Sequence, residues 1–301
     1  MSASDSRIAV PSDRQIALWL GACFAVVYVG FADGFFKGSD EVGVFQTALA
    51  LGVEGRLDVP PLMHTFPGRD GRIYSHFALG QSVLALPLIA AARVTGAALP
   101  AAWVDALAGP VVEHRGHRFG GSLEIAATTL YAPLASGVLI ALFFVFERRL
   151  GVSQRNALLA SALLGGTTYA AFMSGYFLRH TTEAITILAG FLGVAEYRRT
   201  GSLRALALGS GMGSLTLLIR VPAMLFAPGL AAYLLWVVIE RARAGGLAGP
   251  ARTAAAITAP AAAVFAVHTG LNFWRWEMWI GSPMLAQVGL LDGSLVEGVA
   301  G

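Results

Sequence analysis

Residues 35–76 gather acidic, basic, histidine and turn-forming side chains in a chain that is otherwise mostly apolar. The adjacent carboxylates Asp40 and Glu41 follow Ser39, a residue type that often caps the N-terminus of a helix. Free amide groups and the helix dipole stabilise an anionic carboxylate in a first turn, and such a carboxylate can act as a general base. Acidic residues at a helix start more often serve only as caps. The pair is therefore either a catalytic site or, more commonly, a helix cap.

Other polar residues lie where apolar runs begin or end. Tyr74 and His76 lead into an apolar run, at the depth where a lipid phosphate would lie, although tyrosine is also an ordinary interfacial residue. His180 and Glu183 mark the outer end of a later run, where snorkelling and turn formation explain most charged residues. Arg220 separates two further runs. The histidines lack the spacing of a metal site, so we expect no metal.

Composition identifies the class of protein that must position these residues. The 301 residues are 56% hydrophobic and only 13% charged, and the mean hydropathy is +0.66. These values indicate an all-α polytopic membrane protein. The net charge of +3 does not indicate nucleic-acid binding, because the arginines occur in short clusters between apolar runs. A single cysteine, Cys23, excludes an internal disulfide framework.

Seven apolar runs are candidate transmembrane helices, since a crossing takes about 20 apolar residues. They cover residues 15–32, 125–146, 157–178, 181–197, 205–219, 223–239 and 253–271. Three connectors are rich in arginine: Arg148, Arg149 and Arg155; Arg198, Arg199 and Arg204; and Arg241, Arg243 and Arg252. Two runs separate each connector from the next, as expected if all three face the cytoplasm. Residues 1–14 are then a cytoplasmic N-terminus before an uncleaved signal-anchor helix.

The same parity argument makes residues 33–124 one long outer loop. The first run carries the chain outwards, and residues 125–146 must carry it back. The apolar residues 77–92 therefore cannot be a lone crossing. They form either a juxtamembrane helix or a shallow hairpin with residues 97–112, and Pro100, Asp105 and Pro110 favour the first. Within the loop we expect a helix from about residue 40 to 52, whose stripe of Val42, Phe45 and Leu49 lies on the membrane.

Three further local features are predicted. Residues 67–72, with Asp70 and Gly71 at the centre, are typical of a β-turn. The glycines at 209, 211 and 213 allow close helix packing in lipid. Residues 272–283, NFWRWEMWIGSP, are typical of an aromatic anchor just outside the last run.

The order of these features resembles the bacterial members of the GT-C superfamily of integral-membrane glycosyltransferases, which includes protein O-mannosyltransferases and lipid A aminoarabinose transferases. The resemblance covers roughly residues 33–283. It is carried by SDEVGVFQTALAL, DGRIYSHFALGQSVLALPL, ALFFVFERRLGVSQRNALLASALL, FMSGYFLRHTTEAI and LTLLIRVPAMLFAPGLAAYL. Each of these motifs is degenerate, and the likeness is one of order and pattern.

The resemblance implies an inverting sugar transfer at the outer membrane face, from a polyprenyl-phosphate-linked donor to a hydroxyl of a protein, lipid or glycan acceptor. Asp40 takes the place of the family's general base, with Glu41 beside it. Ser75 and His76 stand where members carry a positively charged or histidine motif, although the usual Pro-Pro or Lys-Pro is missing. His180 and Glu183 stand where many members have an aspartate.

The leaving lipid phosphate needs cations in a low-dielectric cleft. Arg220, His76, Arg118 and Arg72 are the candidates, with Tyr74 at the same boundary. No cofactor is implied. Family members usually carry more spans, so we expect residues 272–301 to be an interrupted outer loop and the chain to be an N-terminal fragment. The implied location is the bacterial inner membrane.

Two other readings remain open. A transporter or flippase of lipid-linked sugars would normally show broken helices and charges near the midplane, whereas here the charges gather at span ends and in one loop. A non-catalytic scaffold of the same fold is the other.

Overall fold

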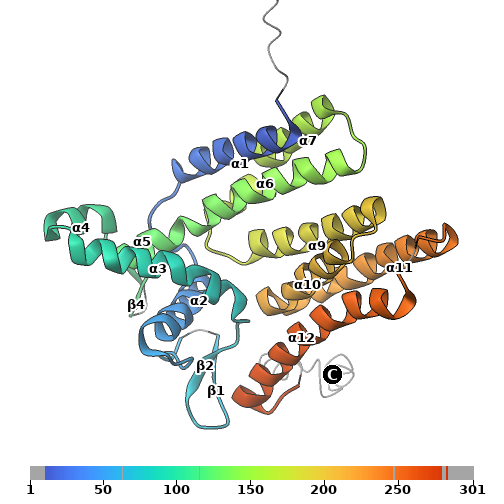
Figure 1. Cartoon of the computed structure of the whole chain (residues 1–301). Coiled ribbons are helices and arrows are strands. Elements are labelled where there is room, and N and C mark those ends of the chain that lie inside the picture. Colours follow the sequence, from blue (N-terminus) through green and yellow to red (C-terminus); the bar gives the residue numbers. More distant parts are fainter. Residues whose placement is uncertain (1–10, 63, 115, 247, 280–282, 284–301) are drawn as a thin grey trace, which may run out of the picture.

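The computed structural model describes residues 11–62, 64–114, 116–246, 248–279 and 283, and these are mostly helical (Figure 1). The helices are α1 (Asp13–Val29), α2 (Ser39–Leu49), η1 (Ala50–Glu54), α3 (Gly80–Ala98), α4 (Ala101–Ala108), α5 (Leu123–Thr129), α6 (Tyr131–Arg149), α7 (Gln154–Thr167), α8 (Tyr169–Met173), α9 (His180–Thr200), α10 (Leu203–Ile219), η2 (Val221–Phe226), α11 (Ala227–Arg243) and α12 (Pro250–Trp276). The strands form two antiparallel hairpins, β1 (Thr65–Pro67) with β2 (Ile73–Ser75) and β3 (Glu113–His114) with β4 (His117–Arg118).

The long helices form a layered bundle. α1 packs on α6, α6 on α9, and α9 on both α10 and α11, while α10 also packs on α12 (Figure 1). In the described part of the chain, four helices are long and apolar enough to cross a membrane: Gly80–Ala98, Leu123–Arg149, Val221–Arg243 and Pro250–Trp276. Leu203–Ile219 is apolar but shorter. The chain thus has the composition and helices of an all-α membrane protein, and the number of seven spans stays a prediction.

Small residues bring α9 and α10 together, as the sequence indicates for Gly209 and Gly213. A Cβ atom on Gly193 would lie 2.4 Å from the Cα atom of Gly209, and one on Gly190 would lie 3.1 Å from Gly213. Gly211 instead faces α12, where its Cβ would meet Pro260 at 3.4 Å. Such close backbone approach gives the packing contacts that hold helices together where water supplies no driving force.

The segment before α5 folds into a compact unit around α2, and here one prediction is wrong. Val42 and Phe45 do not lie on a membrane but are buried, with Phe36, Phe77 and Phe177 around them. The reason is that α3 and the loop before α9 cover the apolar face of α2. The helix also begins one residue earlier than expected, since Gly38 and not Ser39 is its N-cap residue.

One predicted span and the predicted juxtamembrane stretch differ from the observed helices. Residues 157–178 do not form one helix, because α7 ends at Thr167 and α8 starts after an extended Thr168. The hydroxyl oxygen of Thr168 accepts a hydrogen bond from the Ala170 backbone N–H and so caps α8. Of the apolar stretch 77–92, residues 80–92 belong to α3, which continues to Ala98 and is long enough to cross a membrane. Its first turn meets Leu218 and Ile219 at the end of α10, and its juxtamembrane placement stays a prediction.

The predicted β-turn at residues 67–72 is confirmed as the tip of the β1–β2 hairpin, with Gly71 at φ 75°. The predicted aromatic anchor is only partly external, because α12 continues to Trp276. Arg275 and Trp276 are buried there, and the Arg275 guanidinium donates a hydrogen bond to the Ser75 carbonyl, while Trp279 is exposed. Residues 1–10 and most of the predicted terminal loop lie outside the described residues.

Candidate functional site

Asp40 lies in the first turn of α2 with its side chain 40% exposed. Two basic side chains flank the carboxylate. The Nε2 atom of His64 is 3.6 Å from Oδ1, and Nη2 of Arg179 is 3.6 Å from Oδ2. His64 has a positive φ of 69°, a conformation that non-glycine residues adopt rarely and that tends to occur at functional sites. Asp40 is thus an accessible carboxylate between two groups that can carry positive charge.

Arg179 connects Asp40 to the rest of the site. It immediately precedes α9, its side chain is only 14% exposed, and its guanidinium lies 4.1 Å from the centre of the Phe77 ring. Burial lowers the pKa of Arg179 to about 10, so the group remains a cation at neutral pH. Arg179 is attracted by the charges of Asp40 and Glu183 and repelled by that of Arg220. A fixed, largely desolvated cation of this kind suits binding of an anionic oxygen.

A second carboxylate, that of Glu183 in the first turn of α9, lies close to two more basic groups. Nη1 of Arg220 is 3.2 Å from its Oε2 atom, and Nδ1 of His180 is 3.8 Å from the same atom. Glu183 is buried, whereas Arg220 and His180 keep about a third of their side chains exposed. The structure therefore brings the predicted residues His180, Glu183 and Arg220 together, next to Arg179.

His76 faces the same region from the end of the β1–β2 hairpin. Its Nδ1 atom is 2.8 Å from the carbonyl oxygen of His64, and the two imidazole rings are 5.4 Å apart. A carbonyl oxygen only accepts hydrogen bonds, so Nδ1 carries the proton and Nε2 is unprotonated in the neutral ring. Burial lowers the pKa of His76, and the nearby Arg179 charge acts in the same direction.

Glu41 does not share the position of Asp40. It is 1% exposed, and its carboxylate accepts hydrogen bonds from the backbone N–H groups of Lys37, Gly38 and Phe177. Burial raises the pKa of Glu41, although these three donors oppose the shift. The geometry is that of a helix cap which also ties α2 to the loop before α9. Of the adjacent acidic pair, only Asp40 is accessible to a substrate.

Three other predicted residues lie elsewhere. Tyr74 is 2% exposed, and its hydroxyl donates to Asp70 at 2.7 Å, so that burial and this bond raise its pKa to about 12. Arg72 lies on the exposed hairpin tip, 3.6 Å from Asp58. Arg118 belongs to the β3–β4 hairpin and pairs with Glu113 at 3.7 Å. None of these three contacts Asp40, His180, Glu183 or Arg220 among the described interactions.

The two groups closest to Asp40, His64 and Arg179, were not among the predicted site residues. Arg179 adjoins His180 in the sequence, so its place at the start of an apolar run was a usable signal. His64 gave no such signal, because it lies in a loop without periodicity, 24 positions after Asp40. Its place beside the carboxylate is a tertiary feature: His64 directly precedes β1, and its carbonyl oxygen accepts hydrogen bonds from the backbone N–H and the Nδ1 atom of His76, directly after β2.

Two cavities are lined by residues that neighbour this cluster in the chain, although no side chain of the cluster itself lines either one. The first, of about 540 Å³, is mostly apolar and lies between α9, α10, η2, α11 and α12; its lining includes Thr216, Leu217 and Ala223, on both sides of Arg220 in the chain. The second, of about 500 Å³, lies between the start of α2 and the β3–β4 hairpin. It is lined by Lys37, Gly38, Ser39, Val42, Leu62, His114, His117 and Phe119.

Neither a metal centre nor a known relative guides the interpretation of this cluster. Among the described residues, no group of three or more His, Cys, Asp or Glu side chains could hold a metal ion. No protein-family model, curated protein or solved structure matches the chain. Function must therefore be argued from the site itself.

Proposed function

We propose that the chain is a membrane glycosyltransferase, which moves a sugar from a polyprenyl-phosphate-linked donor to an acceptor hydroxyl. One observation carries the proposal: an accessible carboxylate, Asp40, lies 3.6 Å from the desolvated cation Arg179. Nearby, Glu183 pairs with two further basic side chains, His180 and Arg220. A base for a hydroxyl and several cations for a phosphate are the two requirements of this reaction.

In the proposed reaction, Asp40 removes the proton from the acceptor hydroxyl. The acceptor oxygen then attacks the anomeric carbon and forms the new glycosidic bond, while the bond from that carbon to the phosphate oxygen breaks. The lipid phosphate leaves with the electron pair of this bond, and Arg179, His180 and Arg220 offset its growing negative charge. A single displacement of this kind inverts the anomeric centre and needs one base, so Glu41 is free to remain a cap.

The two cavities supply the proposed substrate sites. The mostly apolar cavity suits the polyprenyl chain of the donor, and Arg220, which lies between two of its lining segments in the sequence, is proposed to meet the phosphate. The cavity beside α2 suits the acceptor, since Ser39 and Val42 of the same helical turn line it. Its histidines and Phe119 offer hydrogen bonds and an aromatic surface to a sugar or a hydroxylated side chain.

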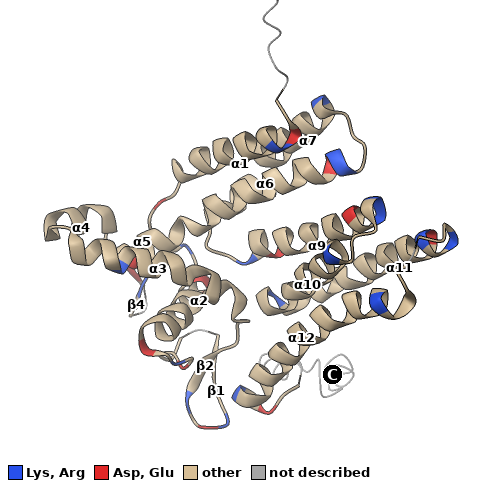
Figure 2. Cartoon of the chain, viewed as in Figure 1, with Lys and Arg blue, Asp and Glu red and all other residues tan. Residues whose placement is uncertain are grey.

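We also propose that seven spans place this cluster at the outer face of a bacterial inner membrane, with the N-terminus in the cytoplasm. Figure 2 supports the arrangement: arginines gather at the ends of α6, α9 and α11 that lie away from α2. There Arg149 pairs with Glu196 and Arg198 with Glu240. Arginine-rich connectors tend to stay in the cytoplasm, which puts the Asp40 end of the bundle outside.

The decisive experiment uses the purified full chain in lipid nanodiscs with radiolabelled polyprenyl-phosphate sugars and a panel of protein, lipid and glycan acceptors. We expect Asp40→Asn to reduce transfer by about 100-fold or more, since general base catalysis contributes on the order of 10² to 10⁴. Asp105→Asn is the matched control, because Asp105 is an exposed residue of α4. Equal transfer by wild type and Asp40→Asn would refute the proposal. If labelled lipid crosses the membrane of vesicles that contain the protein but no sugar is transferred, a transporter would be favoured. The break between α7 and α8 would then resemble the broken helices of transporters.

A further inference from the structure

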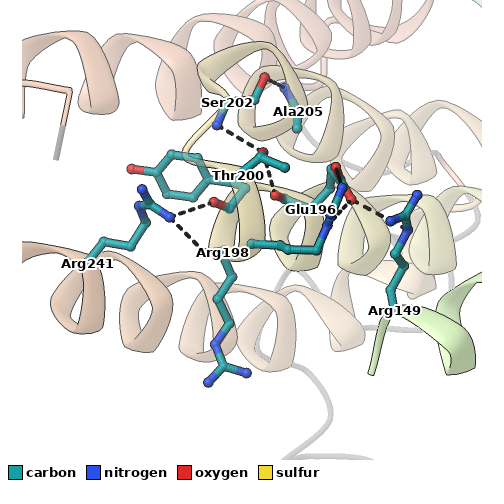
Figure 3. A network of polar contacts seen from close by, with 9 residues as sticks. Arg149, Glu196, Arg198, Thr200, Ser202, Ala205 and Arg241 are labelled. Atoms are coloured by element: carbon teal, nitrogen blue, oxygen red, sulfur yellow. Dashed lines mark hydrogen bonds and ion pairs between the residues drawn. The ribbon is translucent and has the colours of Figure 1, made fainter. Parts of the chain in front are cut away.

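The opposite end of the bundle contains a second charged site, formed where three helices end. The C-terminal turns of α6, α9 and α11 bring together Arg149, Arg198, Arg199 and Arg241. Figure 3 shows three of them, Arg149, Arg198 and Arg241. Basic residues at helix C-termini are favoured by the helix dipole and by the positive-inside rule. Those rules explain why each arginine is there, but not why the four converge on one cavity.

This arginine pocket has a volume of about 570 Å³. Besides the four arginines, Glu240, Tyr233 and Leu150 line it. Glu240 makes two hydrogen bonds with Arg198, at 2.8 and 2.9 Å, and Glu196 holds Arg199 at 2.7 Å and Arg149 at 3.5 Å. Four arginines thus meet two carboxylates, which leaves an excess of two positive charges around the cavity.

The arginines differ in how freely they could bind a ligand. Arg241 is structural, because it donates hydrogen bonds to the carbonyl oxygens of Tyr197 and Arg198 at the end of α9. Arg149 and Arg199 share the single carboxylate of Glu196, and their side chains are 41% and 56% exposed. These two are therefore the arginines best placed to engage an added anion.

Apolar surface adjoins the pocket on α11. Leu235, Trp236 and Ile239 are 61%, 48% and 41% exposed, and Trp236 lies under the guanidinium of Arg198 at 4.4 Å. α11 belongs to one of the helices long and apolar enough to cross a membrane. An exposed tryptophan between an arginine cluster and an apolar helical face is typical of a position at the lipid head groups. A ligand here would have an anionic head and an apolar tail.

We propose that the arginine pocket binds the phosphate head group of an anionic phospholipid, whose acyl chains lie along α11. Basic pockets between membrane helices commonly bind such head groups. The site is separate from the Asp40 cluster, since the 21 residues of α9 between them span roughly 30 Å. The proposal therefore stands whether or not the chain transfers sugars.

The test compares full-length protein in nanodiscs of phosphatidylcholine alone and of phosphatidylcholine with phosphatidylglycerol. Native mass spectrometry measures the phosphatidylglycerol retained, and a thermal melt measures the stabilisation. We expect selective retention by the wild type, and about 30-fold weaker retention by Arg149→Gln/Arg199→Gln, because each arginine near anionic lipid contributes about a factor of five. The control variant Arg56→Gln/Arg118→Gln loses the same two positive charges, but from the end of the molecule that contains α2. It should retain phosphatidylglycerol as well as the wild type does.

Equal retention of the two lipids by the wild type would overturn the proposal, and this measurement does not depend on the variant folding. Retention unchanged in Arg149→Gln/Arg199→Gln would overturn it as well. Titration with inorganic phosphate separates the two possible sources of the anion. The same stabilisation by millimolar phosphate in phosphatidylcholine nanodiscs would identify a free-phosphate site and refute the lipid assignment.

Discussion

The two charged ends of the bundle are built in different ways. At the arginine pocket, each basic residue lies in the last turn of a helix, and its partners are partly exposed carboxylates or nearby carbonyl groups. At the Asp40 cluster, Asp40, His64, Arg179 and Arg220 come from four separate segments, and Arg179 and Glu183 are mostly buried. Exposed ion pairs contribute little to stability, whereas buried charges must be held by precise neighbours. The contrast separates a surface shaped by general rules from a site that needs tertiary placement.

The sharpest test of this contrast compares one arginine from each end. We expect Arg179→Gln to reduce sugar transfer by about 100-fold or more, because removing one group that stabilises transition-state charge typically costs that much. Arg199→Gln should leave transfer unchanged, since Arg199 pairs with Glu196 at the far end. Initial rates with saturating donor measure both. Similar losses in the two variants would mean that transfer depends on overall charge or folding and not on the Asp40 cluster.

A smaller effect is expected on stability. Arg220→Met leaves the buried carboxylate of Glu183 without its nearest cation, at 3.2 Å in the native protein. We expect a loss of about 2 kcal/mol, below the usual value for a fully buried pair because Arg220 is one-third exposed. Arg199→Met should have a much smaller effect, because exposed ion pairs contribute little to stability. Chemical unfolding followed by circular dichroism gives both values.

A double variant checks the cause. Glu183→Gln/Arg220→Met should be less destabilised than the sum of its single variants, because no unpaired carboxylate remains. Strict additivity would show that the two side chains act independently.

The smallest effect concerns pH and again belongs to the Asp40 end. Burial lowers the pKa of His76 below its ordinary value of 6.5, so the unfolded chain binds this proton more readily than the folded chain. The resulting stability is present above about pH 6.5 and is lost as the pH falls through the lower folded-state pKa. The groups facing His76 are His64, Arg179 and Asp40.

His76→Asn provides the measurement. Its amide can still donate to the His64 carbonyl, but it does not titrate, so melting temperatures between pH 7.5 and 5 should fall less steeply than in the wild type. His117→Asn, a change in the β3–β4 hairpin, should keep the wild-type slope. Parallel slopes for wild type and His76→Asn would contradict the assigned burial effect.

The comparison also shows why some predictions of structure succeeded. The positions of α6, α9, α10, α11 and α12 follow from uninterrupted apolar runs, and the turn at Gly71 follows from local chemistry. The close contact of α9 with α10 follows from glycines at 209 and 213. Each of these depends on residues near one another in the chain. Local signals were misleading where a neighbour intervened: the apolar face of α2 is covered by the protein itself, and Thr168 interrupts what composition indicates is one span.

By itself, the sequence determined a mostly helical protein with helices apolar enough for a membrane, and it singled out Asp40, His180, Glu183 and Arg220. Composition and periodicity are enough for the helices, because helices in lipid satisfy their backbone hydrogen bonds locally. The four residues were singled out by their places at the ends of apolar runs and by the resemblance. Only the tertiary structure decided that Asp40 is accessible while Glu41 is a buried cap. It also placed His64 and Arg179 beside Asp40, and kept Arg72, Tyr74 and Arg118 apart from it. Contacts between distant segments depend on how hairpins and helix ends pack, and no spacing in the sequence encodes them.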